Sequence, residues 1–273
     1  GVGSDDVLAM SFLTFFNAKE PVLFPDITYS FYDVWAGLFH IPYECQPLDA
    51  NFEIVTEDYL KPCGGIVIPN PNAPTGAEKE LAQLERIIAA NSDVIVIVDE
   101  AYIDFGGESA VRLISEYDNL LVVQTFSKSR SLAGMRIGYA FGNEKLIKYL
   151  NDAKYSFNSY TMNTVTIAMG VEAVRDEAYF QETVGKVIAT REWTKRELQR
   201  LGFVFPDSKS NFIFASHPKY PAKELFEALK QEGIYVRYFA KPRIDNYLRI
   251  SIGTDEEMKA LIAFLDEYVG ENI

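Results

Sequence analysis

The sequence predicts an α/β fold in which a mostly parallel central sheet is covered by helices on both faces, with a smaller α+β unit following it. In the first half, short runs that are apolar at nearly every residue alternate with stretches of helical spacing. Strands buried on both faces show this pattern, and a helix between them returns the chain to the same edge, which makes the strands parallel. After about residue 143, the order of strands and helices becomes typical of an α+β domain.

The strands expected in the first half are short and apolar. We expect them at residues 21–25, 43–48, 65–69, 94–102, 120–126 and 136–142. Apolar residues at helical spacing predict helices at 78–91 and 108–117, and a further helix follows the first glycines. In sheets of this kind, ligands bind at the carboxyl ends of the strands, so polar residues at those ends are the candidates for a site.

The second half begins with a long helical region at residues 165–202. Strand patterns and two more helices follow it, at 203–206, 211–216, 221–232 (helix), 234–239, 247–253 and 255–269 (helix). We expect a large domain over residues 1–160 and a small C-terminal domain over 161–273, joined by a helix because no low-complexity linker separates them. The chain opens directly on a glycine motif, so we also expect that the N-terminal part of the large domain precedes this sequence.

Composition narrows the class of protein. The chain has 273 residues, 48% of them hydrophobic, and can bury a sizeable core. Its formal net charge of −13 argues against nonspecific binding to nucleic acid, which requires a basic surface. The two cysteines, Cys45 and Cys63, and the two histidines, His40 and His217, argue against a metal site and a disulfide scaffold. Because no apolar run is long enough to span a bilayer and no signal peptide is visible, we expect a cytoplasmic protein without membrane contacts.

Polar residues that a strand does not need stand at several strand ends. Asp99 directly follows the apolar run at 94–98, where a carboxylate is costly unless a cation partners it. Lys128 stands between two serines just after the strand at 120–126. Gly3, Ser4 and Asp5 open a helix, where free backbone N–H groups can hold a phosphate, although Ser and Asp are also ordinary helix caps.

These features complement one another when they are considered together. A phosphate-binding helix start, a buried carboxylate, a lysine able to form a Schiff base and a nearby arginine, Arg136, are the parts that hold pyridoxal 5′-phosphate (PLP). That cofactor withdraws electrons well only when its pyridine nitrogen is protonated, which calls for a buried aspartate, and a lysine carries it as an imine. The residues therefore predict a PLP enzyme.

Four motifs carry a resemblance to a known family: "NPNAPTG" at 70–76, "VDEAYIDF", "TFSKSRSLAGMRIGYA" and "LRISIGT". In this order they resemble the motifs of the fold-type I PLP-dependent aminotransferases, and their amino-acid sequences are most similar to those of the histidinol-phosphate aminotransferases. The resemblance extends over essentially the whole chain. It implies a homodimeric transaminase of histidine biosynthesis that converts L-histidinol phosphate with 2-oxoglutarate by a ping-pong mechanism.

The resemblance also implies roles for single residues around the cofactor. Lys128 would carry PLP and move a proton at the substrate's α-carbon, and Asp99 would pair with the pyridine nitrogen. Tyr102 would donate to the cofactor's phenolic oxygen, and Tyr29 would stack on its ring. The phosphate would be held by Gly3, Ser4, Asp5, Ser127 and Arg136.

Two further groups follow from the same resemblance. Arg249 would bind the anionic end of the substrate, with Arg237 as a second candidate and Asn211 as a third. The asparagine that bonds the phenolic oxygen commonly stands directly before "PTG", where this chain has Ala73. Asn72, one position earlier, is therefore the candidate. Members of the family also have an N-terminal arm that this sequence does not contain.

Other functions remain open at this point. An aromatic amino acid aminotransferase and a threonine-phosphate decarboxylase share the family's motifs, and the decarboxylase also takes a phosphorylated substrate. A PLP-binding regulatory domain is an alternative of a different class, although the chain shows no helix-turn-helix segment or basic stretch.

Overall fold

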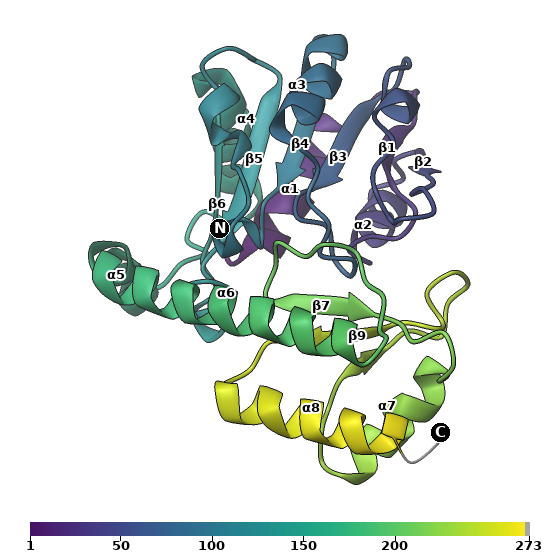
Figure 1. Cartoon of the computed structure of the whole chain (residues 1–273). Coiled ribbons are helices and arrows are strands. Elements are labelled where there is room, and N and C mark those ends of the chain that lie inside the picture. The colour runs from purple at the N-terminus through teal and green to yellow at the C-terminus, as the bar shows by residue number, and fades with distance from the viewer. Residues whose placement is uncertain (271–273) are drawn as a thin grey trace.

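Six strands form the larger of two sheets in a computed structural model, which describes residues 1–270 (Figure 1). Their order is β2–β1–β3–β4–β5–β6, with all neighbours parallel except β6, which runs antiparallel to β5. The strands are β1 (Val22–Pro25), β2 (Tyr43–Gln46), β3 (Gly65–Pro69), β4 (Val96–Asp99), β5 (Leu120–Thr125) and β6 (Gly138–Gly142). The predicted α/β class with a mostly parallel sheet is confirmed.

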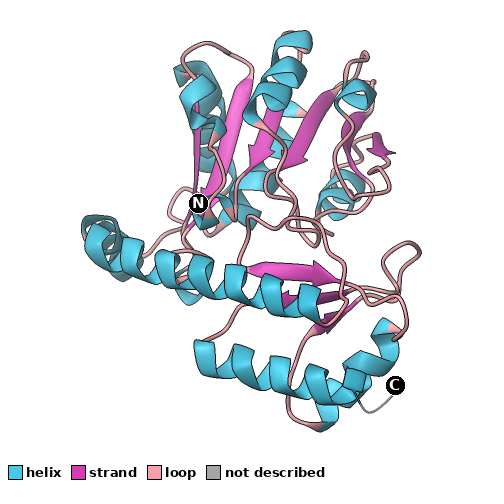
Figure 2. Cartoon of the chain, in the orientation of Figure 1, coloured by secondary structure: helices cyan, strands magenta, loops and turns pink. Residues whose placement is uncertain are grey.

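Helices cover this sheet on both faces (Figure 2). They are α1 (Ser4–Phe15), α2 (Tyr32–Leu38), α3 (Leu81–Ala90) and α4 (Glu144–Phe157). Side chains of α1, α2 and α4 pack on one face, while α3 and two 3₁₀ turns, η1 (Thr56–Tyr59) and η3 (Ala110–Leu113), pack on the other. Successive residues of a strand point to opposite faces, so each central strand supplies both cores.

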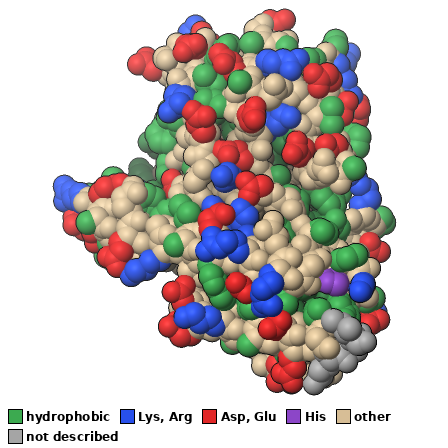
Figure 3. All heavy atoms as spheres, viewed as in Figure 1, with side chains coloured by type: hydrophobic (Ala, Val, Ile, Leu, Met, Phe, Trp, Pro, Cys, Tyr) green, Lys and Arg blue, Asp and Glu red, His purple; other side chains and the backbone are tan. Residues whose placement is uncertain are grey.

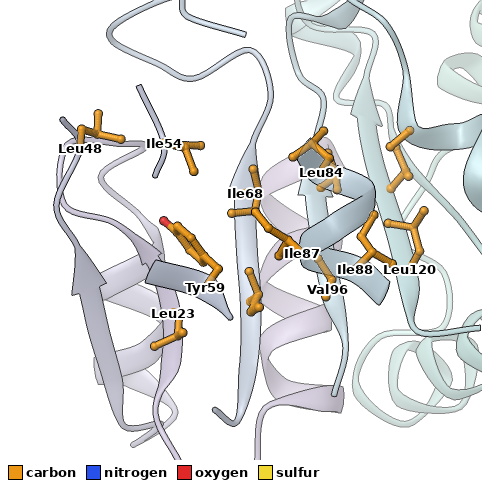
Figure 4. Packing of buried hydrophobic residues seen from close by; sticks show 14 of the residues in the cluster. Leu23, Leu48, Ile54, Tyr59, Ile68, Leu84, Ile87, Ile88, Val96 and Leu120 are labelled. Carbon is orange, nitrogen blue, oxygen red and sulfur yellow. The ribbon is translucent and has the colours of Figure 1, made fainter. Parts of the chain in front are cut away.

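The alternation is visible within single strands. In β4, Val96 and Val98 join the core under α3, whereas Ile97 between them joins the core under α1 and α2. Figure 4 shows Ile87 and Ile88 of α3 lying over Ile68, Val96 and Leu120. Because β1, β3 and β4 are buried at every residue, these strands carry no polar face, which explains their largely apolar sequences.

The second half forms a three-stranded antiparallel sheet of order β7–β9–β8, flanked by helices. Its elements are α5 (Thr164–Arg175), α6 (Glu177–Arg200), β7 (Phe212–Ala215), α7 (Ala222–Gln231), β8 (Arg237–Tyr238), β9 (Leu248–Ser251) and α8 (Asp255–Gly270). Buried side chains of α6, α7 and α8 make a core with β7 and β9. The division of the chain at residue 160 stays a prediction.

Three expected elements differ from the structure. The helix predicted at 108–117 is only the short turn η3, because buried Glu100 binds the Ser109 hydroxyl and the Ala110 N–H and fixes the backbone there. The strand expected at 203–206 is absent from the described residues apart from one bridge between Val204 and Ser216. The long helical region is two helices, because the chain breaks at Asp176, whose carboxylate caps α6.

Two apolar side chains from the second half complete a core of the first. Phe214 of β7 and Ile244, in the loop before β9, are buried in the cluster that α3 covers. Arg191 of α6 adds a polar connection, since its buried guanidinium donates to the carbonyls of Phe105 at 2.8 Å and Ser210 at 2.9 Å. These contacts fix how the two sheets face each other.

The surface carries charges of both signs. Figure 3 shows acidic and basic side chains intermingled over one face, with apolar side chains between them. Within residues 1–270, no helix has both the length and the hydrophobicity that a membrane span requires.

The α3 core gives a direct test of the fold. Ile87→Ala should lower the free energy of unfolding by about 2–5 kcal/mol, because it removes a fully buried side chain. Its neighbour Arg86 is exposed and pairs with Glu57 at the surface, so Arg86→Ala should cost less than about 1 kcal/mol. Urea unfolding measures both, and equal losses would show that α3 does not pack as described.

Candidate functional site

A cavity of about 160 Å³ lies at the carboxyl ends of β3, β4 and β5. Its lining includes the last residues of two strands, Pro69 and Asp99, and the loop that follows β5. The full lining is Ser4, Asp5, Tyr29, Pro69, Pro71, Ala73, Asp99, Ala101, Tyr102, Ser127, Lys128, Ala133 and Arg136. Sequence elements more than a hundred residues apart therefore meet at one edge of the sheet, as the parallel topology requires.

Asp99 is the buried acid of this cavity, with only 6% of its surface exposed. Tyr32 donates its hydroxyl to Asp99 Oδ2 at 2.7 Å, and the Ala101 N–H donates to Oδ1 at 3.3 Å. Burial raises the pKa of Asp99 to about 6, although these hydrogen bonds act in the opposite direction. The carboxylate is thus costly to ionise unless a cation comes to lie beside it.

Lys128 lies in the same cavity without an acidic partner. Among the described residues its ammonium makes no ion pair, and its Nζ lies 5.3 Å from the centroid of the Tyr102 ring. The Tyr102 ring packs edge-on against Phe212 of β7, which fixes its position. The loop is tied down on the far side of Lys128, where Ser129 donates to Asp104.

The start of α1 and Arg136 form a cup beside Lys128. The first bond within α1 joins the Val7 N–H to the Gly3 carbonyl, so the N–H groups of Ser4 and Asp5 have no helical acceptor. Gly3 has a φ of +85°, and a Cβ there would lie 2.3 Å from Arg136 Nη2, so only glycine fits. Arg136 itself lies 3.5 Å from both Ser127 Oγ and Asp5 Oδ2.

Tyr29 connects the cup to a neighbouring cavity. Its hydroxyl donates to Asp5 Oδ1 at 2.8 Å, and burial together with this bond raises the pKa of Tyr29 above its usual value. Its ring stacks on Phe31, with the two centroids 5.6 Å apart. The hydroxyl therefore stays protonated and orients the Asp5 carboxylate.

Asn72 lies outside this cavity, in contrast to the expectation that it bonds a cofactor. Its side chain is buried within the turn, where Nδ2 donates to the Ile27 carbonyl at 2.9 Å and to Thr75 Oγ1 at 3.1 Å. Its Oδ1 accepts from Thr28 at 3.1 Å. Because both amide hydrogens are engaged, Asn72 braces the turn, and Ala73 faces the cavity instead.

A larger cavity of about 650 Å³ adjoins the first, since Tyr29 and Ala73 line both. Arg237 of β8 and Arg249 of β9 line it, which places the two predicted substrate arginines together. Arg249 lies over the Phe212 ring, and its Nε is buried without a hydrogen-bond partner among the described residues. A buried donor without an acceptor is a binding position for an anion.

Asn211 is not brought into either cavity. Its carbonyl accepts from the Ile252 N–H at 2.8 Å, which joins it to the end of β9, and it lines neither space. It stays a prediction without support from this geometry.

The sequence did not single out two residues that shape the site. Tyr32 holds Asp99, yet it is one of 16 tyrosines and begins a helix without a distinguishing pattern. Arg191 is buried and bonds one backbone carbonyl from each half of the chain, yet it lies in a helix rich in charged residues. The sequence does offer one signal for Arg191: helical spacing places it on the same side of α6 as the buried residues Val184 and Leu198.

The arrangement combines four chemical abilities. A half-buried amine without a counterion can act as nucleophile or base, and a buried carboxylate can stabilise a ring cation. A helix start with Arg136 can bind a phosphate, and two further arginines can bind the anionic end of a second molecule.

Comparisons with known proteins agree with this chemistry. The model of the family "Aminotransferase class I and II" matches residues 1–265. A histidinol-phosphate aminotransferase of Lactococcus lactis subsp. cremoris (strain MG1363) is 53% identical over 269 residues, covering 98% of this chain and 76% of the relative. One of Clostridium botulinum (strain Okra / Type B1) is 54% identical over 259 residues, covering 95% and 73%.

The fold has a solved counterpart. The crystal structure of the histidinol-phosphate aminotransferase from Clostridium acetobutylicum matches with a TM-score of 0.91 over 99% of this chain and 83% of that chain, at 22% identity. This likeness concerns the fold, while the family match and the identity of the two relatives concern the kind of enzyme. The chain therefore belongs to the class I and II aminotransferases and, within them, to the histidinol-phosphate aminotransferases.

Proposed function

We propose that the chain is a PLP-dependent transaminase that exchanges the amino group of L-histidinol phosphate with 2-oxoglutarate in histidine biosynthesis. One observation carries the proposal: Lys128 and Asp99 share a small cavity with Arg136 and the free N–H groups that begin α1. The relatives' names supply the substrate, and the two adjoining cavities are consistent with it.

The donor set fits PLP. The cofactor has a pyridine nitrogen, a phenolic oxygen, an aldehyde and a phosphate, each of which needs a different partner. Asp99 suits the nitrogen and Tyr102 the phenolic oxygen, while Lys128 suits the aldehyde. The backbone N–H groups of Ser4 and Asp5, the Ser127 hydroxyl and Arg136 suit the phosphate, and the missing Cβ of Gly3 leaves Arg136 room to approach α1.

PLP, when bound, supplies an electron sink next to the substrate's α-carbon. The chain's own residues do the remaining work. Lys128 would carry the cofactor and, with its amine free, would move the proton at the α-carbon. Asp99, held by Tyr32, would keep a proton on the ring nitrogen, because an ionised acid and an adjacent cation stabilise each other in a buried site. The N–H groups of α1 and Arg136 fix the position of the ring through its phosphate.

The substrate's anionic end belongs to the second cavity. Arg237 and Arg249 line it, and the unpaired Nε of Arg249 awaits an acceptor. Both substrates of the proposed reaction have an anionic group joined to the reacting carbon through two linking atoms, a phosphate in one and the distal carboxylate in the other. The same arginines can therefore serve both half-reactions.

The rival reactions are less well supported. The relatives at 53% and 54% identity are histidinol-phosphate aminotransferases, which favours this reaction over an aromatic amino acid aminotransferase or a threonine-phosphate decarboxylase. The same relatives favour an enzyme over a PLP-binding regulatory domain.

A cytoplasmic location and a homodimer complete the proposal. Helix α5 supports the dimer, because Ile167, Val171 and Val174 lie on one side of it and are all exposed. Apolar side chains grouped in this way mark contact surfaces. We propose that a second copy of the chain covers them.

Lys128→Ala should abolish transamination and the visible absorbance of lysine-bound PLP, because no other amine lines the cavity as the described residues form it. Lys145→Ala, an exposed lysine at the start of α4, is the matched control and should leave both unchanged. Absorbance spectra after incubation with PLP, together with turnover assays, give the answer. A Lys128→Ala protein that keeps the absorbance would contradict the assignment.

Arg249→Ala should raise the KM for histidinol phosphate about 10- to 100-fold while the PLP absorbance stays intact, because the charge-assisted bond it loses lies outside the cofactor cavity. Steady-state kinetics and spectra test this. Loss of the PLP absorbance in this variant would contradict the assignment and indicate that Arg249 contributes to cofactor binding.

For the apoprotein, Asp99→Asn should raise the free energy of unfolding near neutral pH and leave it almost unchanged in acid. Burial raises the pKa of Asp99 from 3.8 to about 6, so the folded state binds this proton more tightly than the unfolded state. The wild type therefore loses stability relative to the variant as pH rises from about 4 to above 6, by up to about 3 kcal/mol.

Urea unfolding of both apoproteins at about pH 4 and about pH 7 measures this difference. Asp93→Asn, an exposed site just before the same strand, is the control and should show no such change. In the presence of PLP the order should reverse, because only the carboxylate can pair with the ring cation. A pH-independent effect of Asp99→Asn would refute the buried-acid account.

A further inference from the structure

The loop between β8 and β9, residues 239–247, connects the small sheet to the large one, and we call it the strap. Ile244 at its centre is 4% exposed and packs in the core cluster under α3, which belongs to the large sheet. The strap is braced internally, since the Ile244 N–H donates to the Lys241 carbonyl at 3.2 Å and the Tyr247 N–H to the Ile244 carbonyl at 3.2 Å. Its ends are fixed by β8 and β9, so the strap spans the second cavity between two anchors.

Arg243 holds the strap to the large sheet. Its Nη1 donates to Asp26 Oδ2 at 2.7 Å, and its Nη2 donates to the carbonyls of Leu48 at 2.7 Å and Asp49 at 3.1 Å. Asp26 is fixed in turn, because its Oδ1 accepts from the Leu48 N–H at 2.9 Å. The backbone of Arg243 has a φ of +69°, which a residue with a side chain adopts only where its contacts require it.

The charge of the second cavity is unbalanced. Arg237, Lys241 and Arg249 all line it, and none of the three forms an ion pair among the described residues. Arg243, the remaining cation in the lining, is matched by Asp26. Three unmatched cations around one space repel one another, so the cavity favours an anion that carries more than one negative charge.

We propose that Lys241 determines the preference of this cavity for a phosphate monoester, and that Arg243 is the positioning residue that holds Lys241 over it. The proposal rests on the proposed function and deepens it. A phosphate monoester carries about −1.5 to −2 charges near neutral pH, whereas the distal carboxylate of 2-oxoglutarate carries one. Two arginines suffice for the carboxylate, while the third cation adds attraction mainly for the phosphate.

Lys241→Gln in the PLP-loaded protein tests the preference in two half-reactions. The variant should raise the half-saturating concentration of histidinol phosphate about 10-fold and that of glutamate, the amino acid corresponding to 2-oxoglutarate, less than about 3-fold. The limiting rates should stay unchanged, because Lys241 touches no reacting atom. Lys223→Gln on α7, an equal charge change at an exposed site, is the control and should leave both values unchanged. Equal effects on both substrates, or none, overturn the role of Lys241.

A double variant separates positioning from direct binding. Arg243→Gln should also raise the half-saturating concentration of histidinol phosphate at an unchanged limiting rate, since the strap loses its anchor. If Arg243 acts through Lys241, the double variant Lys241→Gln/Arg243→Gln is no worse than the more severe single variant. Effects that multiply show that Arg243 binds the phosphate itself, which overturns its positioning role.

Inhibition by inorganic phosphate distinguishes this inference from the proposed function. Phosphate should compete in the glutamate half-reaction of the wild type, and Lys241→Gln should weaken that inhibition about 10-fold. A wild type that turns over glutamate but not histidinol phosphate contradicts the proposed substrate, while weakened phosphate inhibition in the variant still supports the anion site. Unchanged inhibition in the variant overturns the site even if histidinol phosphate is the substrate.

Discussion

The candidate site depends on one physical constraint, the burial of the Asp99 carboxylate. Asp99 ends a strand that is covered on both faces, so its side chain lies at a buried edge of the sheet with 6% of its surface exposed. Tyr32 and one backbone N–H are its only hydrogen-bond donors within the described residues, and burial still raises its pKa to about 6. A site with such an acid is stable in its ionised form only when a cation lies beside it, and the cavity that Lys128 shares provides the space.

The two sheets divide the work between them. The large sheet brings the cofactor-binding candidates to one edge, because parallel strands end there together. The small sheet brings Arg237 and Arg249 to the adjoining cavity, where the buried Nε of Arg249 has no hydrogen-bond partner among the described residues and can bind an anion. The relative position of the two cavities depends on the contacts that join the two halves of the chain. Among these are the hydrogen bonds of buried Arg191 and the packing of Ile244 in the core under α3.

The sequence predicted what local pattern determines and missed what packing determines. The strand at 65–69 has the predicted bounds, since a short apolar run between turn residues is typical of a buried strand. Lys128, Asp99 and Arg136, which line one cavity, were singled out because polar residues at the ends of apolar strands stand out. The helix expected at 108–117 failed, because Glu100, buried by tertiary contacts, fixes its start. Asn72 was assigned to the cofactor by position in a motif, whereas the direction of its amide is set by three partners distant from the motif or within its turn.

The account depends on a buried acid that is stabilised by a ring cation, and the pKa of Asp99 measures this most directly. Carbon-13 NMR of protein labelled at aspartate carboxyl groups, with Asp99→Asn to assign the resonance, would follow its titration with and without PLP. We expect a pKa of about 6 in the apoprotein and a much lower one with PLP bound, because an adjacent positive charge favours the carboxylate. The same pKa in both states would contradict the pairing of Asp99 with the cofactor.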